Sequence, residues 1–372
     1  MSTAKIAHLT SVHPRNDIRI YHKELISLNR NYKCSLIVAD GLGSYVDDNK
    51  INIIDVGKPN SRLDRMKNSP QRILQAALKL DADLYHLHDP ELLQIALNLK
   101  KAGRKVIFDA HEDLPKQVLS KPYLNKFNAY IISFIVKYYE KFICSKLDAI
   151  VTATPVIRDK FSKISKKAID INNYPLLGEL TPLDKDWSKI QNEIAYVGGI
   201  TKIRGIEQVV DALSLLKTST RLNLVGTCNE KSTTEIFIKK IGWHAVNELG
   251  QLNREQVREV LQKSIAGLVT FLPVPNHIDA QPNKMFEYMS AGIPVIGSNY
   301  PLWKSIIEDN NCGICVDPEN PKQIANAIDI LVNDKTLAAQ MGQNGIKAVN
   351  EKYNWSIEEA KLFQLYEELL GN

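Results

Sequence analysis

Two segments in the second half of the chain combine glycine, charge and helix-start signals in a way that suits the binding of a phosphorylated ligand. In AYVGGITKIRG (195–205), a strand-like run ends at Gly198 and Gly199, and Lys202 and Arg204 precede a helical pattern. Backbone N–H groups at a glycine turn and at a helix N-terminus bind phosphate oxygens. We therefore expect a diphosphate cradle here; the alternative is a tight turn with solvated cations.

The second segment is DAQPNKMFEYMSAGIPVIGS (279–298), in which Pro282 is suited to open a helix. Lys284 falls in the first turn, where the helix dipole disfavours a cation, and a bound anion would remove that conflict. Glu287 can accept two hydroxyls of a ribose, and Asp279, eight residues earlier, can hold a sugar from the preceding loop. The alternative for Glu287 is a carboxylate on the helix surface.

The sequence lacks the motifs of other common classes of site. No G-x-G-x-x-G follows the first strand-like run, as a nicotinamide dehydrogenase requires, and there is no P-loop. His86 and His88 share one face of a strand, but no spacing identifies the further ligands that a metal ion needs. We therefore expect no metal site and no cofactor.

Short apolar runs alternate with segments of helical periodicity, which is typical of βαβ units and a parallel sheet. The expected strands are 5–10, 34–39, 51–56, 84–88, 105–110 and 149–153, and then 194–197, 221–225, 245–249, 266–271, 294–298 and 313–316. The expected helices beyond residue 200 are 206–216, 254–263, 283–291, 321–332 and 355–370.

This pattern predicts an α/β fold of two doubly wound, Rossmann-like domains facing a cleft. Residues 1–172 form the first domain, 173–192 a linker and 193–352 the second domain. Residues 353–372 form an amphipathic helix that packs back toward the first domain. Ligands of such sheets bind at the carboxyl ends of the strands, near the point where the strand order reverses.

Charge is distributed unevenly over the 372 residues, whose net charge is +5. Residues 1–180 carry +9 and residues 181–372 carry −4, so we expect the first half to face a polyanion or an anionic surface. The alternative is that these cations only keep the protein soluble. Aromatic–basic RNA motifs are absent, and no nucleic acid partner is expected. No stretch is apolar enough for a membrane span and no signal peptide is visible, so we expect a cytoplasmic protein.

Four segments together resemble the GT-B glycosyltransferases of family 4. They are Gln281–Ser298, YVGGITKIRG (196–205), NNCGICVDPENPKQIANAI (310–328) and FDAHED (108–113). The resemblance covers nearly the whole chain and is most specific over 194–350. It implies a retaining, metal-independent transfer of a sugar from a nucleotide-diphosphate donor to a hydroxyl of a lipid-linked or glycan acceptor. The expected setting is bacterial surface polysaccharide assembly, such as lipopolysaccharide or capsule.

The resemblance also implies roles for individual residues. The acidic pair of the family falls on Asp279 and Glu287, which with His111 are the expected catalytic residues. Where the family has an arginine after Val-Gly, this chain has Gly199, and Asp279 replaces a glutamate. The expected donor-binding residues are Gly198, Gly199, Lys202, Arg204, Asn283, Lys284 and Glu287. His13 and His88 are expected on the acceptor side, and the segment from His13 to Arg19 stands in place of the family's glycine-rich loop.

Two other functions remain open from the sequence. A related enzyme could epimerise or hydrolyse the nucleotide sugar without an acceptor. A non-enzymatic basic module could bind an anionic membrane surface.

One segment bears on the membrane directly. Residues 116–146 hold six lysines, one acid (Glu140) and many apolar or aromatic side chains. Such a segment can lie in a membrane interface on the inner face of the cytoplasmic membrane, but it is too charged to span a bilayer. The alternative is a helix whose apolar stripe is buried on its own sheet.

Overall fold

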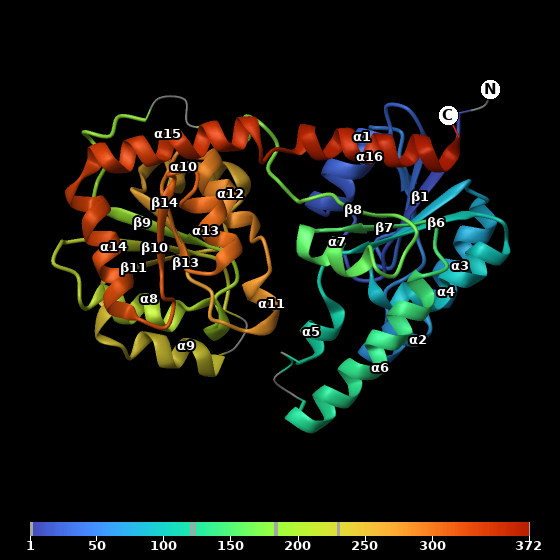
Figure 1. Cartoon of the computed structure of the whole chain (residues 1–372), viewed down its shortest axis with the longest axis horizontal. Coiled ribbons are helices and arrows are strands. Elements are labelled where there is room, and N and C mark those ends of the chain that lie inside the picture. Colours follow the sequence, from blue (N-terminus) through green and yellow to red (C-terminus); the bar gives the residue numbers. More distant parts are fainter. Residues whose placement is uncertain (1–2, 120, 122–123, 182–184, 229–230, 372) are drawn as a thin grey trace. The chain divides into compact units, whose positions relative to one another are not determined.

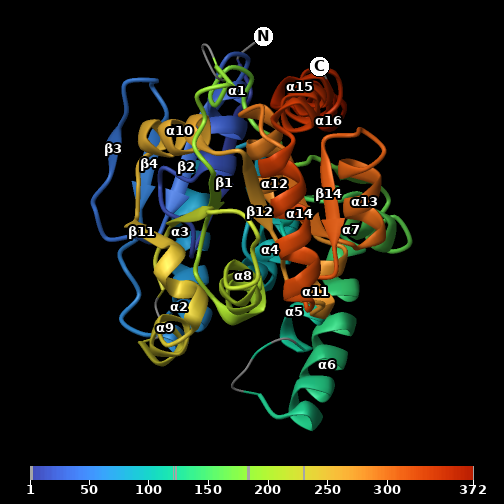
Figure 2. The same ribbon diagram turned by 90° about the vertical axis from the view of Figure 1, so that its left-hand side faces the viewer.

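The computed structural model describes residues 3–119, 121, 124–181, 185–228 and 231–371. The chain divides into two compact units, Met1–Asn173 with Ser356–Asn372 (unit 1) and Tyr174–Trp355 (unit 2). Figure 1 labels their elements and Figure 2 gives a second view. Of the expected linker, Pro182, Leu183 and Asp184 lie outside the described residues.

Unit 1 is built on a sheet whose strands are parallel except at one edge. Its order is β3-β4-β2-β1-β5-β6-β7-β8, and only β3 is antiparallel to its neighbour. The strands are β1 (Lys5–Leu9), β2 (Lys33–Val38), β3 (Tyr45–Val46), β4 (Asn52–Asp55), β5 (Leu84–Leu87), β6 (Lys105–Ala110), β7 (Ala149–Thr152) and β8 (Ala168–Asp170). The strand order reverses between β1 and β5, so their carboxyl ends form the expected binding position.

The helices of unit 1 begin with a π-helical segment, η1 (Ile18–Leu25), whose N-cap Asp17 accepts bonds from the N–H groups of Arg19 and Ile20. The others are α1 (Ile26–Leu28), α2 (Arg62–Lys67), α3 (Ser69–Leu80), η2 (Pro90–Leu92), α4 (Leu93–Lys101), α5 (Leu114–Leu119), α6 (Lys126–Cys144), α7 (Pro155–Phe161) and α16 (Trp355–Leu370). One buried apolar cluster joins α3, α4, α6 and α7 to the sheet.

Unit 2 has an entirely parallel sheet of order β11-β10-β9-β12-β13-β14. Its strands are β9 (Glu193–Val197), β10 (Arg221–Val225), β11 (Val246–Gly250), β12 (Ala266–Val269), β13 (Val295–Ser298) and β14 (Gly313–Val316). Here the order reverses between β9 and β12. The segments after these two strands are 198–205 and 270–282, which hold most of the residues expected to bind the donor.

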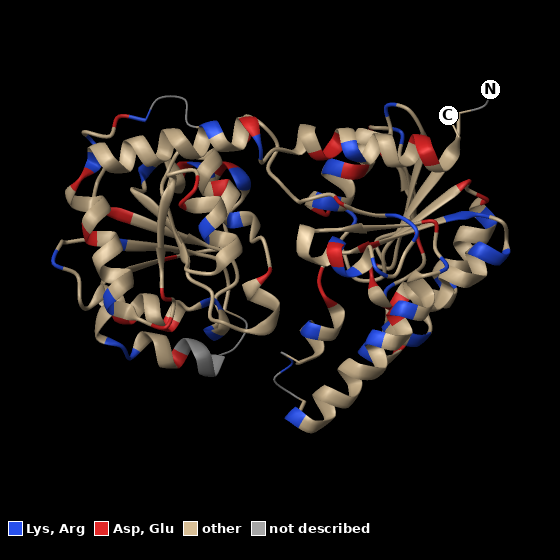
Figure 3. Ribbon diagram, viewed as in Figure 1, with Lys and Arg blue, Asp and Glu red and all other residues tan. Residues whose placement is uncertain are grey.

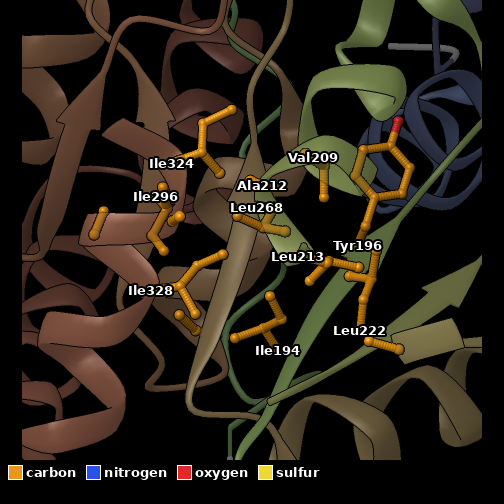
Figure 4. Close-up of a cluster of buried hydrophobic side chains, with 14 of the residues drawn as sticks. Ile194, Tyr196, Val209, Ala212, Leu213, Leu222, Leu268, Ile296, Ile324 and Ile328 are labelled. Atoms are coloured by element: carbon orange, nitrogen blue, oxygen red, sulfur yellow. The ribbon is translucent and has the colours of Figure 1, made fainter. Parts of the chain in front are cut away.

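Helices cover both faces of this second sheet. They are η3 (Lys202–Arg204), α8 (Ile206–Leu213), α9 (Lys231–Ile238), η4 (Ile241–Ala245), α10 (Arg254–Lys263), α11 (Pro275–Ile278), α12 (Asn283–Ser290), α13 (Pro301–Ile307), α14 (Pro321–Asn333) and α15 (Lys335–Glu351). One core packs α8 and α14 on the sheet, where Val209 and Ile328 meet the strand residues Ile194 and Leu268 (Figure 4). The other packs α10, α12 and α13 on the opposite face. Such burial stabilises the unit by about 25 cal/mol per Å² of apolar surface removed from water.

The expected α/β class, the strands and the helices of the second half are confirmed with small shifts of their ends. The short edge strands β3 and β8 and the helices α9, α11, α13 and α15 were not expected.

Two helices of unit 1 matter for function. The C-terminal helix α16 carries Leu362, Leu365 and Tyr366, all buried, and Glu358 of this helix accepts a bond from the N–H of Asn172. The helix α6 extends away from the sheet of unit 1 in both views and carries several lysines (Figures 1, 2 and 3). Among the described residues, no helix is both long and apolar enough to cross a bilayer.

Candidate active site

In unit 2, the turn after β9 and the loop after β12 are joined directly. The N–H of Leu272 donates to the carbonyl of Ile203 over 2.9 Å. Gly205 has a φ of +74°, and a Cβ there would lie 1.9 Å from the carbonyl oxygen of Thr270. A side chain at position 205 would therefore push these two loops apart, and the glycine fixes their close approach.

Arg204 lies beside the expected diphosphate cradle. Its Nη1 donates to the carbonyl of Gly199 over 3.4 Å, and its guanidinium lies 5.4 Å from the ring centroid of Phe271. A Cβ on Gly199 would come within 3.0 Å of the same Nη1. The space next to Gly199 is thus filled by the Arg204 guanidinium. Lys202 is exposed in the same turn.

Glu287 is buried, with 8% of its surface exposed, so it is not a carboxylate on the helix surface. Lys284 Nζ donates to its Oε2 over 2.7 Å, and Arg254 Nη1 donates to its Oε1 over 3.0 Å. Arg254 is the first residue of α10, and its Nε also donates to Glu179 Oε1 over 2.6 Å. Burial opposes ionisation of Glu287, but the charges of Lys284 and Arg254 outweigh it and lower the pKa below the ordinary value.

The structure places the remaining donor-side residues around the start of α12. Asn283 is the first residue of that helix and is exposed. Asp279 follows α11 and is half-buried. Thr201 and Thr270, one in each joined loop, have buried hydroxyl oxygens without a hydrogen-bond partner among the described residues. Buried hydroxyls of this kind are rare without a partner, which a ligand can supply.

In unit 1, the expected histidines gather at the carboxyl ends of β1, β5 and β6. His111 Nε2 lies 3.1 Å from Asp109 Oδ2 and 3.3 Å from His88 Nδ1. The rings of His13 and His111 are 5.0 Å apart between centroids. His13 and His111 are partly exposed, whereas His88 is buried. His88 can therefore act on a sugar substrate only through its neighbours.

Two buried carboxylates hold this group of histidines in place. Asp109 accepts hydrogen bonds from Arg19 Nε over 2.8 Å and from Arg19 Nη2 over 2.9 Å. Burial opposes ionisation of Asp109, but Arg19 outweighs it and keeps the pKa of Asp109 well below its ordinary value. Asp89 accepts from the hydroxyl of Thr10 over 2.8 Å and lies 3.5 Å from His13 Nε2. Burial lowers the pKa of His13, but its bond to Asp17 and the charge of Asp89 outweigh this and raise it.

The residues that hold the expected ones in place were not predicted from the sequence. Arg254 was not singled out, although Asn253-x-x-Gln256 is a capping signal that places it in the first turn of α10. Arg19 and Asp109 lie 90 positions apart, so nothing local in the sequence indicated their pairing.

Comparison with known proteins identifies the second unit. Residues 184–348 match the family model described as glycosyl transferases group 1. An uncharacterized glycosyltransferase of Methanocaldococcus jannaschii is 24% identical over 310 residues, which is 78% of this chain and 77% of that protein. A capsular polysaccharide biosynthesis glycosyltransferase of Staphylococcus aureus, CapM, is 24% identical over 201 residues, 50% of each chain.

Solved structures show the same fold over the full length. Sucrose-phosphate synthase from Thermosynechococcus elongatus aligns over 99% of both chains with a TM-score of 0.80 and 16% identity. The HepE protein of Anabaena, solved in complex with UDP and glucose, aligns over 98% of this chain and 100% of its own with a TM-score of 0.76 and 15% identity. Residues 184–348 match the group 1 glycosyl transferase model, the GT-B fold extends over the whole length, and the relatives are named glycosyltransferases, so the chain is a glycosyltransferase.

Proposed function

We propose that the protein is a retaining glycosyltransferase of family 4. It takes a sugar from a nucleotide-diphosphate donor and transfers it to a hydroxyl of a lipid-linked or glycan acceptor in surface polysaccharide assembly. The observation that carries the proposal is the buried Glu287 of α12, held ionised between Lys284 and Arg254. The start of α12 lies at the same sheet edge as the Gly198–Arg204 turn. HepE, a protein of this fold, is solved with UDP and glucose, and CapM acts in capsular polysaccharide biosynthesis, which supports the donor class and the setting.

Cleavage of the bond between sugar and diphosphate leaves negative charge on the departing phosphate. Fixed cations that face this charge stabilise the transition state more than the ground state. Arg204 and Lys284 supply such cations, so the transfer is proposed to need no metal. The acceptor hydroxyl attacks from the side of the leaving group and gives its proton to the departing phosphate oxygen. Glu287 binds the ribose hydroxyls, Asp279 contacts the sugar, and His111 orients the reactants.

The proposal is tested by a binding screen followed by product analysis. A donor at 100 times its dissociation constant raises stability by about 2.7 kcal/mol, so a thermal-shift screen of UDP-, GDP- and ADP-sugars identifies the nucleotide. NMR of the product from an α-linked donor should show an α linkage, whereas a β linkage contradicts retention. Free sugar or an epimerised donor formed without acceptor would indicate the alternative enzyme. Turnover should persist in EDTA, and its rescue by Mg²⁺ or Mn²⁺ would contradict the metal-free mechanism.

Substitution of Arg204 by alanine should lower kcat as well as donor affinity, because charge on the diphosphate grows in the transition state. Lys202→Ala is the matched control, since this cation lies in the same turn but is exposed. Steady-state kinetics of both variants check the prediction. A larger loss in Lys202→Ala would show that the wrong cation has been assigned to the diphosphate.

Replacement of His111 by alanine should reduce kcat with little change in nucleotide affinity, because the proposal places it at the reacting groups and not at the nucleotide. His22→Ala, at an exposed histidine of the same unit, is the control. Single-turnover kinetics and nucleotide titration separate the two effects. An unchanged kcat would leave His111 with a structural role only.

The acceptor side of the proposal includes attachment to an anionic membrane through α6. The described part of this helix exposes large apolar side chains, with Phe127 at 75% and Tyr130 at 71%. The others are Ile131, Ile132, Phe134, Ile135, Tyr138, Tyr139 and Phe142. Lys126, Lys137 and Lys141 are exposed among them. Glu140, the one acid, is buried and paired with Lys160. The alternative of an apolar stripe buried on its own sheet does not describe these side chains.

This face has the chemistry of a membrane-surface helix, with aromatic rings for the interface and lysines for anionic headgroups. We expect the protein to sediment with anionic vesicles at low salt and to stay in the supernatant with neutral ones. Because each lysine near such a surface contributes about 1 kcal/mol, changing Lys126, Lys137 and Lys141 to Glu should weaken binding by about 100-fold or more.

The matched control changes Lys33, Lys79 and Lys101 to Glu, which alters net charge equally on other exposed elements of unit 1. It should keep most of the vesicle binding. Equal losses of vesicle binding in both triple variants would show that binding depends on net charge alone and not on α6. If the unaltered protein remains in the supernatant with anionic vesicles, the membrane attachment is refuted and a water-soluble acceptor is favoured.

A further inference from the structure

Four buried side chains of unit 1 take no direct part in the proposed transfer. His8 of β1 and His86 of β5 are register partners on adjacent strands, His88 follows two residues later, and Glu24 comes from η1. All four are at most 1% exposed. The ring centroids of the three histidines lie 4.7 to 4.9 Å apart. Placing so many polar groups in a core is costly unless each has a partner.

The inner atoms of this group lie close to one another. His8 Nδ1 lies 2.8 Å from His88 Nε2, and Glu24 Oε2 lies 3.6 Å from the former and 3.8 Å from the latter. His86 Nε2 and Glu24 Oε2 have no hydrogen-bond partner within the described part of the chain. One ligand atom from each of the four residues fits within 4.8 Å of all the others.

The other nitrogen of each of these rings, the outer one, lies next to an oxygen atom. Tyr366 Oη lies 2.9 Å from His8 Nε2 and 2.9 Å from His86 Nδ1. His88 Nδ1 lies 3.3 Å from Asp109 Oδ2. Each ring can therefore donate its outer N–H to an oxygen and direct the lone pair of its inner nitrogen toward the other inner atoms. Histidines that bind metal are held in this way by their second nitrogen.

We propose that His8, His86, His88 and Glu24 bind one divalent transition-metal ion, with Zn²⁺ the best match, which ties β1, β5 and η1 together. Three imidazoles and a carboxylate are a donor set of zinc, and two nitrogens on a tetrahedral zinc lie about 3.3 Å apart. The spacings among His8, His88 and Glu24, 2.8 to 3.8 Å, bracket this value, and the ligand atom of His86 lies within 4.8 Å of the other three. Four protein ligands and full burial leave no open position, so the ion is structural and separate from the sugar transfer.

Burial lowers the pKa of His8 and His86 and raises the pKa of Glu24. An overlapping group of His88, Asp109 and His111 offers only three ligands.

The test uses the full chain and readouts that do not depend on transfer activity. Elemental analysis of the purified protein should find about one zinc per chain. After prolonged dialysis against 1,10-phenanthroline, the melting temperature should fall, and added Zn²⁺ should restore it. Co²⁺ added to the metal-free protein should give the visible absorption of a four-coordinate ion.

Glu24→Gln distinguishes a metal site from a cluster that is held by hydrogen bonds alone. Glutamine resembles the protonated carboxylate in shape but is a poor metal ligand. Metal affinity should fall at least tenfold in this variant, and His22→Gln, at an exposed histidine of η1, should leave it unchanged. Unchanged affinity in Glu24→Gln would overturn the proposed ligand set. If the unaltered protein holds no metal and neither Zn²⁺ nor Co²⁺ changes its stability or spectrum, the cluster is held by hydrogen bonds alone.

Discussion

Replacement of Glu287 by alanine is expected to abolish sugar transfer while the fold persists. If the carboxylate accepts two ribose hydroxyls, charged hydrogen bonds of about 1.5 to 3 kcal/mol each are lost. This corresponds to about 10² to 10⁴ in donor affinity, and turnover falls with it. Calorimetric titration with the nucleotide and steady-state kinetics measure the two losses, and circular dichroism checks the fold.

The matched control is Glu179→Ala, which removes the other carboxylate that Arg254 contacts but leaves α12 intact. We expect it to keep donor binding within a few-fold of the unaltered protein. Normal turnover in a folded Glu287→Ala protein would refute the family 4 assignment. Equal losses in both variants would mean that Glu287 acts only by positioning Arg254.

The second large effect is on stability and concerns Arg19. This buried side chain pairs with Asp109 and with Glu24 Oε1 at 3.1 Å, and its Nη1 donates to the carbonyl of Ile171 over 2.7 Å. Arg19→Met leaves a buried Asp109 without its counter-charge, which costs about 3 to 5 kcal/mol. Arg19→Met combined with Asp109→Asn should recover part of the loss.

Because the chain has two units, the loss of stability can be assigned to one of them. All four tryptophans, Trp187, Trp243, Trp303 and Trp355, lie in unit 2, so their fluorescence reports on that unit. In urea, Arg19→Met should lower the denaturant concentration of the unfolding transition of unit 1, which circular dichroism detects. The unfolding midpoint measured by tryptophan fluorescence should stay unchanged. Arg30→Met, which breaks an exposed ion pair with Glu359, should cost less than about 1 kcal/mol. A comparable small cost for Arg19→Met would contradict the prediction.

The elements of the fold were predictable because parallel strands are continuous apolar runs bounded by helix starts and turns. The helix α15 was not predictable, because Gly342 and Gly345 interrupt its helical pattern of apolar residues. A Cβ at Gly342 would lie 2.2 Å from the carbonyl oxygen of Gly292, and one at Gly345 would lie 3.1 Å from Met289 Cα. These glycines are required by packing against α12 and the turn after it, which no local pattern reveals.

The candidate site was predictable to the extent that its residues lie close in the sequence. The positions of Glu287 and Lys284 in α12 followed from the helix start at Pro282. Lys284 was expected to need an external anion, but Glu287 lies on the same helix face and accepts its hydrogen bond. Arg254 is 33 positions away from Glu287, and only the folded sheet brings the two together.

The helix α16 has a consequence for the order in which the protein matures. Its residues Leu362, Leu365 and Tyr366 belong to the core of unit 1, but they are synthesised after all of unit 2. On the ribosome, unit 2 can complete its core while the earlier-made unit 1 still lacks a helix, and His8 and His86 still lack the hydroxyl of Tyr366. The usual order, in which the N-terminal domain matures first, can therefore be reversed. A chain that stops short of α16 leaves its first half, and not its last, unfinished.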